Sequence, residues 1–487
     1  MYFSYKKTCL FLGLVILCCS ILSTPITVHA TMEELQAEAD ARKSLPVQTN
    51  EIDNWPVGPT IGAESAILMD ANTGVILYAK NIHKKSYPAS TTKLLTCLIA
   101  IERGNLDDIV KFSYDAVSLP PGSSNMGMDA GEALTLEQCL YGVMVGSANE
   151  VANAVGEYVS GSIDDFIDLM NERAAELGCT DSHFTNTNGL PDDDHYTTVY
   201  DLALISAAYF QNEMLCKIGN TARYHFEPEA TQPDDFYLIN KHQLINGEIV
   251  YDGVQGGKTG YTDAARQTLV TCAERNGMKL VCVVFKEESP AQFTDTVELF
   301  DYGFNNFQVA NISENEDKYQ IESTSFLQTG NDIFGSSRAI LSIDPDSYVI
   351  MPNTITFDDL DSEIDYSVSD ENRIAQISYS YNDIYVGSAY LNVATDTTAI
   401  YEFDSGIETT DVSVERTEPE ISPATTIFVN VKKVLIGILI FAGVVILLFI
   451  VRALIMNSIN ARRRRNRVRR KQNRRERIRS DFDDFDF

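Results

Sequence analysis

A β-hairpin pattern late in the chain places the strongest constraint on the fold. Residues 267–274 and 279–285 are rich in β-branched and apolar side chains, and Asn276-Gly277 lies between them. An Asn-Gly pair between two such runs is typical of a two-residue hairpin turn, so the two strands should pair antiparallel. A second hairpin is predicted near the start of the chain, with strands at 65–70 and 75–78.

Helical patterns separate these two hairpins and follow the second one. Apolar residues recur at helical spacing in 134–145, 149–159, 163–177, 199–209 and 294–304. Early strands, a block of helices and late strands together predict an α/β (α+β) domain, in which helices flank an antiparallel sheet. Alternation in 377–381 and 384–390 predicts a small all-β domain after it.

A serine and a lysine stand where one of the predicted helices begins. Ser90 follows Pro88-Ala89, Lys93 comes three residues later, and the nearly apolar run 94–101 reads as a buried helix that closes near Gly104. The side chains of Ser90 and Lys93 therefore share one helix face. Free backbone N–H groups at the helix start favour negative charge beside Ser90.

Two further motifs follow in the chain, Ser147-Ala148-Asn149 and Lys258-Thr259-Gly260. Ser-x-x-Lys should occur about twice by chance in a chain of this length, whereas Lys-Thr-Gly should occur about 0.1 times. In this order the three motifs form the active-site set of serine acyl-transfer enzymes that recognise penicillin.

With these motifs, the chain resembles the serine D-Ala-D-Ala carboxypeptidases, the low-molecular-mass penicillin-binding proteins. The resemblance covers roughly residues 57–308 and is weaker over the next hundred. It implies a beta-lactamase/transpeptidase-like fold, and in the family a following β domain lifts the catalytic domain off the membrane. The matching text also includes Asn188-Gly189-Leu190-Pro191, His195-Tyr196-Thr197-Thr198 and Tyr261-Thr262-Asp263-Ala264-Ala265.

The predicted reaction removes the terminal D-alanine from a peptidoglycan stem peptide. Ser90 attacks the carbonyl between the two D-alanines, and Lys93 takes its proton because the nearby cation Lys258 favours a neutral amine. Ser147 passes a proton to the leaving amine, and Asn149 binds the substrate amide.

The remaining site residues are predicted to hold the substrate's terminus and its developing negative charge. Lys258 and Thr259 bind the terminal carboxylate, and Gly260 lets substrate lie along the strand. The backbone N–H groups of Ser90 and, by resemblance, Tyr261 form the oxyanion hole. Water then resolves the acyl-enzyme, whereas beta-lactams enter the same route and stall. No cofactor and no metal is expected.

Three other features of the sequence bear on the predicted site. Gln292 stands where close relatives often carry an arginine that helps to bind the carboxylate, which puts substrate affinity in doubt. His195 matches a family position, but a structural loop histidine is the favoured interpretation. Asp192-Asp193-Asp194 fits solvated turn residues better than a calcium site.

The two ends of the chain predict an exported membrane protein. Residues 1–30 read as a signal peptide, with an uncleaved anchor as the alternative. Residues 434–451 carry no charge and reach the lower range of a transmembrane helix. Of the 38 Lys and Arg residues, 12 lie between Arg462 and Arg479, so this tail should be cytoplasmic and the body outside. With a net charge of −31, the acidic body argues against nucleic acid binding.

The predicted organisation follows from these boundaries. It comprises a signal peptide (1–30), a poorly ordered lead-in (31–56), the catalytic domain (57–308), the β domain (309–405), a linker (406–433), the transmembrane helix (434–456) and a basic tail (457–487). Six cysteines remain after signal removal, and Cys97, Cys139, Cys272 and Cys282 fit buried free thiols because they lie in apolar helix or strand patterns.

Two other functions stay open. A beta-lactamase would use the same motifs, but a membrane tether and a β domain are not expected of it. A membrane-bound beta-lactam sensor without peptidase activity is the other alternative. The short Arg-rich tail leaves no room for a signalling domain, which weighs against a sensor.

Overall fold

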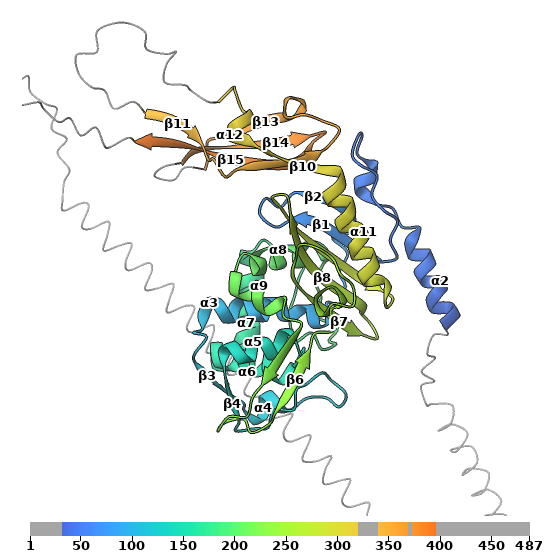
Figure 1. Cartoon of the computed structure of the whole chain (residues 1–487), viewed down its shortest axis with the longest axis vertical. Helices are drawn as coiled ribbons and strands as arrows, with labels where there is room; N and C mark the ends of the chain where they lie inside the picture. Colours follow the sequence, from blue (N-terminus) through green and yellow to red (C-terminus); the bar gives the residue numbers. More distant parts are fainter. Residues whose placement is uncertain (1–31, 320–338, 369–372, 396–487) are drawn as a thin grey trace, which may run out of the picture. The chain divides into compact units, whose positions relative to one another are not determined.

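The catalytic part of the chain is built on a five-stranded antiparallel sheet (Figure 1). The computed structural model describes residues 32–319, 339–368 and 373–395. In the sheet the strand order is β2-β1-β9-β8-β7, so β7 is an edge strand. The strands are β1 (Ser65–Asp70), β2 (Ile76–Lys80), β7 (Val254–Thr262), β8 (Arg266–Arg275) and β9 (Met278–Glu287). Both predicted hairpins are confirmed, as β1–β2 and β8–β9.

Helices cover the two faces of this sheet because its strands are apolar on both sides. Along β9, Val281 and Val283 belong to one apolar cluster, while Cys282 and Val284 belong to the other, as expected for side chains that alternate. The first cluster lies beneath a group of helices and the second beneath α11 (Ala291–Asn306). The helices of the first group are α3 (Lys93–Arg103), α5 (Leu136–Met144), α6 (Asn149–Ser160), α7 (Ile163–Glu176), α8 (Val199–Phe210) and α9 (Glu213–Gly219).

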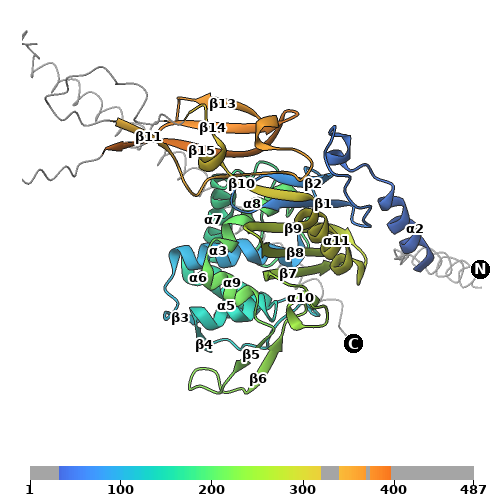
Figure 2. The same cartoon turned by 45° about the horizontal axis from the view of Figure 1, so that its top comes forward.

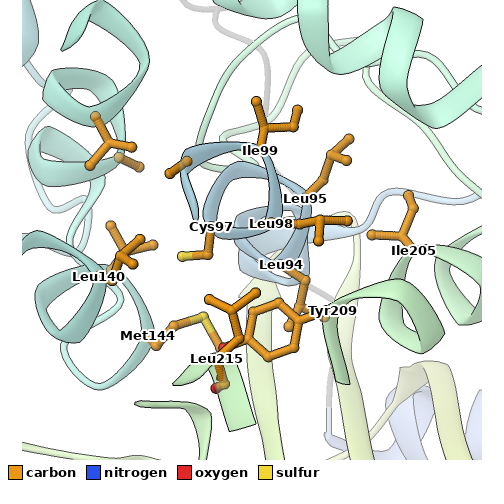
Figure 3. Close-up of a cluster of buried hydrophobic side chains, with 14 of the residues drawn as sticks. Leu94, Leu95, Cys97, Leu98, Ile99, Leu140, Met144, Ile205, Tyr209 and Leu215 are labelled. Atoms are coloured by element: carbon orange, nitrogen blue, oxygen red, sulfur yellow. Dashed lines mark hydrogen bonds between the residues drawn. The ribbon is translucent and has the colours of Figure 1, made fainter. Parts of the chain in front are cut away.

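Helix α3 is the centre of the first cluster (Figure 3). Leu94, Leu95 and Cys97 are completely buried and lie among side chains such as Leu140 of α5 and Tyr209 of α8. A helix that is apolar on all sides is stable only when it is enclosed by other elements. This enclosure fixes the position of the residues that precede α3.

Short elements complete the catalytic domain. They are η1 (Gln48–Glu51), η2 (Ala89–Thr92), β3 (Ile109–Lys111), α4 (Tyr114–Val117), β4 (Ala133–Thr135), β5 (Arg223–Phe226), β6 (Phe236–Ile239) and α10 (Gln243–Asn246). The pairs β3–β4 and β5–β6 are antiparallel two-stranded sheets. The sequence reading did not find these small sheets, because strands of three or four residues give too little alternation to be recognised.

A second sheet begins at Phe307, directly after α11 and two residues before the predicted start of the β domain at 309. Its order is β10-β12-β15-β14-β13, and β11 pairs with β15. The strands are β10 (Phe307–Asn311), β11 (Ala339–Ile343), β12 (Tyr348–Pro352), β13 (Asp361–Asp365), β14 (Arg373–Tyr381) and β15 (Ile384–Thr395), with α12 (Ile312–Asn315) and η3 (Phe357–Asp359) between them. This part of the chain is therefore mainly β, as its alternating pattern predicts.

The segment before the catalytic domain is more ordered than its polar composition suggests. Helix α2 (Met32–Lys43) has a buried Arg42 in its last turn, and the Arg42 carbonyl accepts a hydrogen bond from Lys80 Nζ at 2.9 Å. The indole of Trp55 is buried, donates to the Leu77 carbonyl at 3.0 Å and lies 5.1 Å from the Phe307 ring. The predicted poor order is wrong for residues 42–55, because these long-range contacts hold them.

The six cysteines that follow the predicted signal peptide all lie in the described part and are unpaired, and all but Cys216 are buried. The predicted signal peptide, linker, transmembrane helix and basic tail lie outside the described residues. Within the described residues, no helix combines the length and apolar character needed to cross a membrane.

Candidate active site

Ser90 lies in the tight turn η2, just before the buried helix α3. Two glycines allow the chain to pass close to this turn. At Gly189, which has φ +85°, a Cβ would lie 1.7 Å from the Ala89 carbonyl oxygen. At Gly260, a Cβ would lie 2.9 Å from the Ser90 nitrogen. Strand β7 and the loop at Gly189 therefore lie against the serine turn on two sides, and a larger residue at either position would force the backbone segments apart.

Lys93 has the surroundings of a general base for Ser90. Its side chain is completely buried, and its Nζ lies 3.2 Å from Ser90 Oγ, 2.6 Å from Asn149 Oδ1 and 2.7 Å from the Asn188 carbonyl. Burial, reinforced by the nearby Lys258, lowers the pKa of Lys93 well below its usual value. A neutral amine donates two N–H groups to the two amide oxygens. Its lone pair then accepts from the Ser90 hydroxyl, which is the contact that proton removal requires.

The second motif forms the turn between α5 and α6. Ser147 adopts φ +56°, an uncommon conformation for a residue with a Cβ, and Asn149 begins α6. Ser147 Oγ accepts a hydrogen bond from Lys258 Nζ at 3.1 Å. Asn149 Oδ1 binds Lys93 instead, so the second motif contacts both lysines.

The third motif lies in the middle of edge strand β7, and Lys258 is buried there. Besides Ser147, its Nζ donates to the Thr259 carbonyl at 2.9 Å. Burial, followed by the charge of Lys241, lowers the pKa of Lys258 to about 7. The ammonium and neutral forms of Lys258 are therefore both accessible near neutral pH.

A cavity of about 710 Å³ opens beside these residues. Six of the eight predicted site residues line it, namely Ser90, Ser147, Asn149, Thr259, Gly260 and Tyr261. The other two, Lys93 and Lys258, are buried directly behind the cavity wall, where they bond to lining residues. The structure thus brings all eight together. Gln292 also lines the cavity and is 4% exposed, and its Oε1 has no partner among the described residues.

His195 supports the nucleophile turn from behind. Its Nδ1 accepts a hydrogen bond from the Thr185 backbone N–H at 3.0 Å, so Nε2 carries the proton and donates to Thr92 Oγ1 at 2.9 Å. The Thr92 hydroxyl in turn donates to the Ala89 carbonyl at 2.9 Å. Burial lowers the pKa of His195 to about 4. A neutral, bonded histidine fits the structural role that the sequence favours.

Sequence reasoning missed two groups at the site. The carbonyl of Asn188 accepts a hydrogen bond from Lys93. The Asn188-Gly189 motif indicated this loop, but it did not indicate that a backbone carbonyl binds the lysine. Lys241 lines the cavity and influences Lys258, but a single exposed lysine carries no local signal.

The family of D-alanyl-D-alanine carboxypeptidases matches residues 52–289. A D-alanyl-D-alanine carboxypeptidase of Mycobacterium tuberculosis is 33% identical over 258 residues, which cover 51% of this chain and 84% of that protein. The chain belongs to this family. The resemblance inferred from the motifs is therefore confirmed.

Two other relatives in this family are covered over smaller shares of their length. DacA of Escherichia coli is 30% identical over 307 residues, which cover 61% of this chain and 72% of DacA. DacF of Bacillus subtilis is 32% identical over 252 residues, covering 50% of this chain and 63% of DacF. The chain thus spans somewhat less than two thirds of DacF.

The solved structure of penicillin binding protein 5 from Haemophilus influenzae shows the same fold. It aligns with a TM-score of 0.57 at 24% identity and covers 70% of this chain and 99% of that protein. The predicted fold class, a mixed α/β penicillin-binding domain with antiparallel sheets, is confirmed.

Proposed function

We propose that this carboxypeptidase family member removes the terminal D-alanine from peptidoglycan stem pentapeptides through an acyl-enzyme on Ser90. The observation that carries the proposal is the contact between Ser90 Oγ and the buried amine of Lys93 at 3.2 Å. A neutral lysine at this distance can remove the serine proton as the oxygen attacks.

In the proposed acylation step, Ser90 Oγ bonds to the carbonyl carbon between the two D-alanines. The proton of the hydroxyl passes to Lys93, and the carbonyl oxygen becomes an oxyanion held by the backbone N–H groups of Ser90 and Tyr261. The carbon–nitrogen bond then breaks. The departing amine takes a proton through Ser147, which lines the cavity and is hydrogen-bonded to Lys258.

In the second step, water adds to the ester carbonyl with Lys93 as the base, and Ser90 regains its proton. Free D-alanine and a shortened peptide are the products. A beta-lactam forms the same ester, but its leaving group stays attached, so it acts as a covalent inhibitor.

The terminal carboxylate of the substrate is proposed to bind at Lys258 and Thr259. Thr259 lines the cavity, and the ammonium of Lys258 lies directly behind it. Gln292 lies in the same cavity and adds an uncharged amide. A substrate with a free carboxyl end is thereby favoured, which makes the activity that of an exopeptidase.

Product analysis on a purified pentapeptide tests this function. The expected products are one free D-alanine and one tetrapeptide per substrate, with no product from the Ser90→Ala variant. Cleavage at an internal bond, or no cleavage by a protein that still binds benzylpenicillin, would contradict the proposal.

A beta-lactamase is the second candidate, and the composition of the cavity disfavours it. Among the described residues that line the cavity, the single carboxylate is Asp263, which accepts a hydrogen bond from the Tyr261 hydroxyl. Those described lining residues include no glutamate that could activate a deacylating water. Rapid turnover of a chromogenic cephalosporin would favour the beta-lactamase.

We also propose that the protein crosses the membrane once, with its catalytic body outside. The proposal rests on the signal-like residues 1–30, the apolar residues 434–451 and the 12 basic residues between Arg462 and Arg479. Protease added to intact protoplasts should remove the body and spare a tag at Phe487. Loss of the tag would show the opposite orientation.

A further inference from the structure

Glu288, the residue after β9, is held between two arginines from distant parts of the chain. Its Oε1 accepts hydrogen bonds from Arg42 Nη2 and from Arg266 Nε, both at 3.1 Å. Its other oxygen forms an ion pair with Arg266 Nη2. Burial alone would raise the pKa of Glu288, but the two arginines lower it below its usual value, so the carboxylate is charged. Such charge-assisted contacts fix a carboxylate in direction as well as in distance.

Arg266 connects this carboxylate to the end of strand β7. It begins β8 directly after the turn 263–265, and its backbone pairs with Thr262, the last residue of β7. Strands β7, β8 and β9 lie side by side in the sheet (Figure 2). Arg266 adopts φ +54°, an uncommon conformation for a residue with a Cβ, which persists only where surrounding contacts impose it. Its Nη1 also donates to the Tyr261 hydroxyl at 3.4 Å. The ion pair with Glu288 therefore helps to fix the turn that ends β7.

Arg42 connects the same carboxylate to the segment that precedes the catalytic sheet. It lies in the last turn of α2 and is 6% exposed. Its Nε donates to the Gly62 carbonyl at 3.1 Å, and its own carbonyl accepts a hydrogen bond from Lys80 Nζ of β2. The Gly62 N–H in turn donates to Asp295 Oδ2 of α11 at 2.8 Å. Arg42 is thus tied to β2 and to the segment before β1, while its guanidinium reaches Glu288.

The three charged residues form one connected path from the N-terminal segment to the catalytic cavity, although none of them belongs to the described lining of the cavity. We propose that Arg42 is a positioning residue for acylation: through Glu288 and Arg266 it holds the end of β7 against the serine turn. The inference rests on the proposed function, because the Tyr261 N–H of β7 is one of the two groups assigned to the oxyanion hole. Arg42 precedes residues 52–289, so the family match does not assign this role.

Loss of the Arg42 guanidinium should slow acylation without unfolding the protein. Glu288 and Arg266 would remain paired with each other, but the pair would no longer be tied to the N-terminal segment. A shift of about 1 Å in catalytic groups costs about a hundredfold in rate, so a smaller shift of β7 should cost about tenfold. The oxyanion forms only in the transition state. The loss should therefore appear in the rate constant at saturating benzylpenicillin rather than in the half-saturating concentration.

Acylation kinetics of Arg42→Met test the proposal, because methionine keeps an apolar side chain but has no guanidinium. The saturating rate constant should fall about tenfold, while the half-saturating concentration changes less than about twofold. Arg42→Lys, which keeps a charge beside Glu288, should lose less. Arg173→Met is the matched control, because Arg173 also bridges two carboxylates, those of Glu102 at 2.8 Å and Glu176 at 3.0 Å, away from the cavity lining. This control should keep the rate constant of the unmodified enzyme.

The same measurement in a Glu288→Gln background shows whether Arg42 acts through this carboxylate. Arg42→Met should cause no further loss there, because the path is already broken. An equal loss in both backgrounds, or an unchanged rate constant when Arg42→Met is the single substitution, would overturn the proposal. Urea unfolding checks that each variant is folded, and Arg42→Lys takes the place of Arg42→Met if the latter is not. Failure of benzylpenicillin to acylate the unmodified protein at Ser90 would instead refute the proposed function.

Discussion

Replacing Gly260 by alanine should reduce the rate of acylation more than it reduces the folding stability of the protein. A Cβ at this position would lie 2.3 Å from Thr268 Oγ1, 2.9 Å from the Ser90 nitrogen and 3.1 Å from Ala89 Cβ. Thr268 cannot easily turn away, because its hydroxyl donates to the Pro88 carbonyl at 2.9 Å. Non-bonded heavy atoms prefer separations of about 3.5–4.0 Å, so β7 must move away from the serine turn by roughly 0.5–1 Å.

The expected magnitudes follow from that displacement. Overpacking a close contact costs about 1–3 kcal/mol of folding free energy. A shift of about 1 Å in catalytic groups can cost about a hundredfold in rate, and here it separates the two N–H groups of the oxyanion hole. The acylation rate with benzylpenicillin should therefore fall by about a hundredfold, while urea unfolding shows a folded variant. Thr268→Ala is the control, because it removes the hydroxyl beside Gly260 but adds no atom between β7 and the serine turn. This variant should lose less activity than Gly260→Ala. An unchanged acylation rate in Gly260→Ala would refute the close-approach argument.

Three other predictions concern charge. Because the pKa of Lys258 is lowered to about 7, kcat/KM for a free-acid peptide should fall above pH 7 as the ammonium is lost. Lys258→Arg should move this decline in kcat/KM to higher pH. Thr259→Val should slow hydrolysis of the free-acid peptide about ten- to hundredfold and hydrolysis of the amidated peptide much less. Gln292→Arg should increase hydrolysis of the free-acid peptide selectively. Equal losses on the acid and the amide in Thr259→Val would contradict the carboxylate role. Burial, with Asp295 nearby, raises the pKa of Glu287 to about 8, so the native state binds more protons than the unfolded state between pH 4.5 and 8. Stability should thus decline as pH rises through this window, and Glu287→Gln should remove at least about 1.4 kcal/mol of that decline in urea unfolding.

The sequence predicts the main elements of the catalytic domain because each has a strong local signal. Asn276-Gly277 identifies the β8–β9 hairpin, and the apolar run after Ser90 identifies α3. The predicted helix at 149–159 differs from α6 by one residue. The three motifs, with Tyr261 added by the resemblance, also name eight residues that the structure brings together at one cavity.

Features that depend on distant contacts could not be predicted in this way. Trp55 lies in a polar stretch, and its burial depends on Leu77 and Phe307, far along the chain. Lys93 binds the carbonyl of Asn188, but a backbone oxygen has no sequence signature.

The central claim is that Ser90 forms the acyl-enzyme with Lys93 as its base. Intact-mass measurement after exposure to benzylpenicillin tests it most directly. One adduct is predicted on the wild-type protein, located by digestion on the peptide that contains Ser90. The Ser90→Ala variant should carry none, and Lys93→Ala should acquire it far more slowly than the wild type. An adduct of equal yield on Ser90→Ala would contradict the claim.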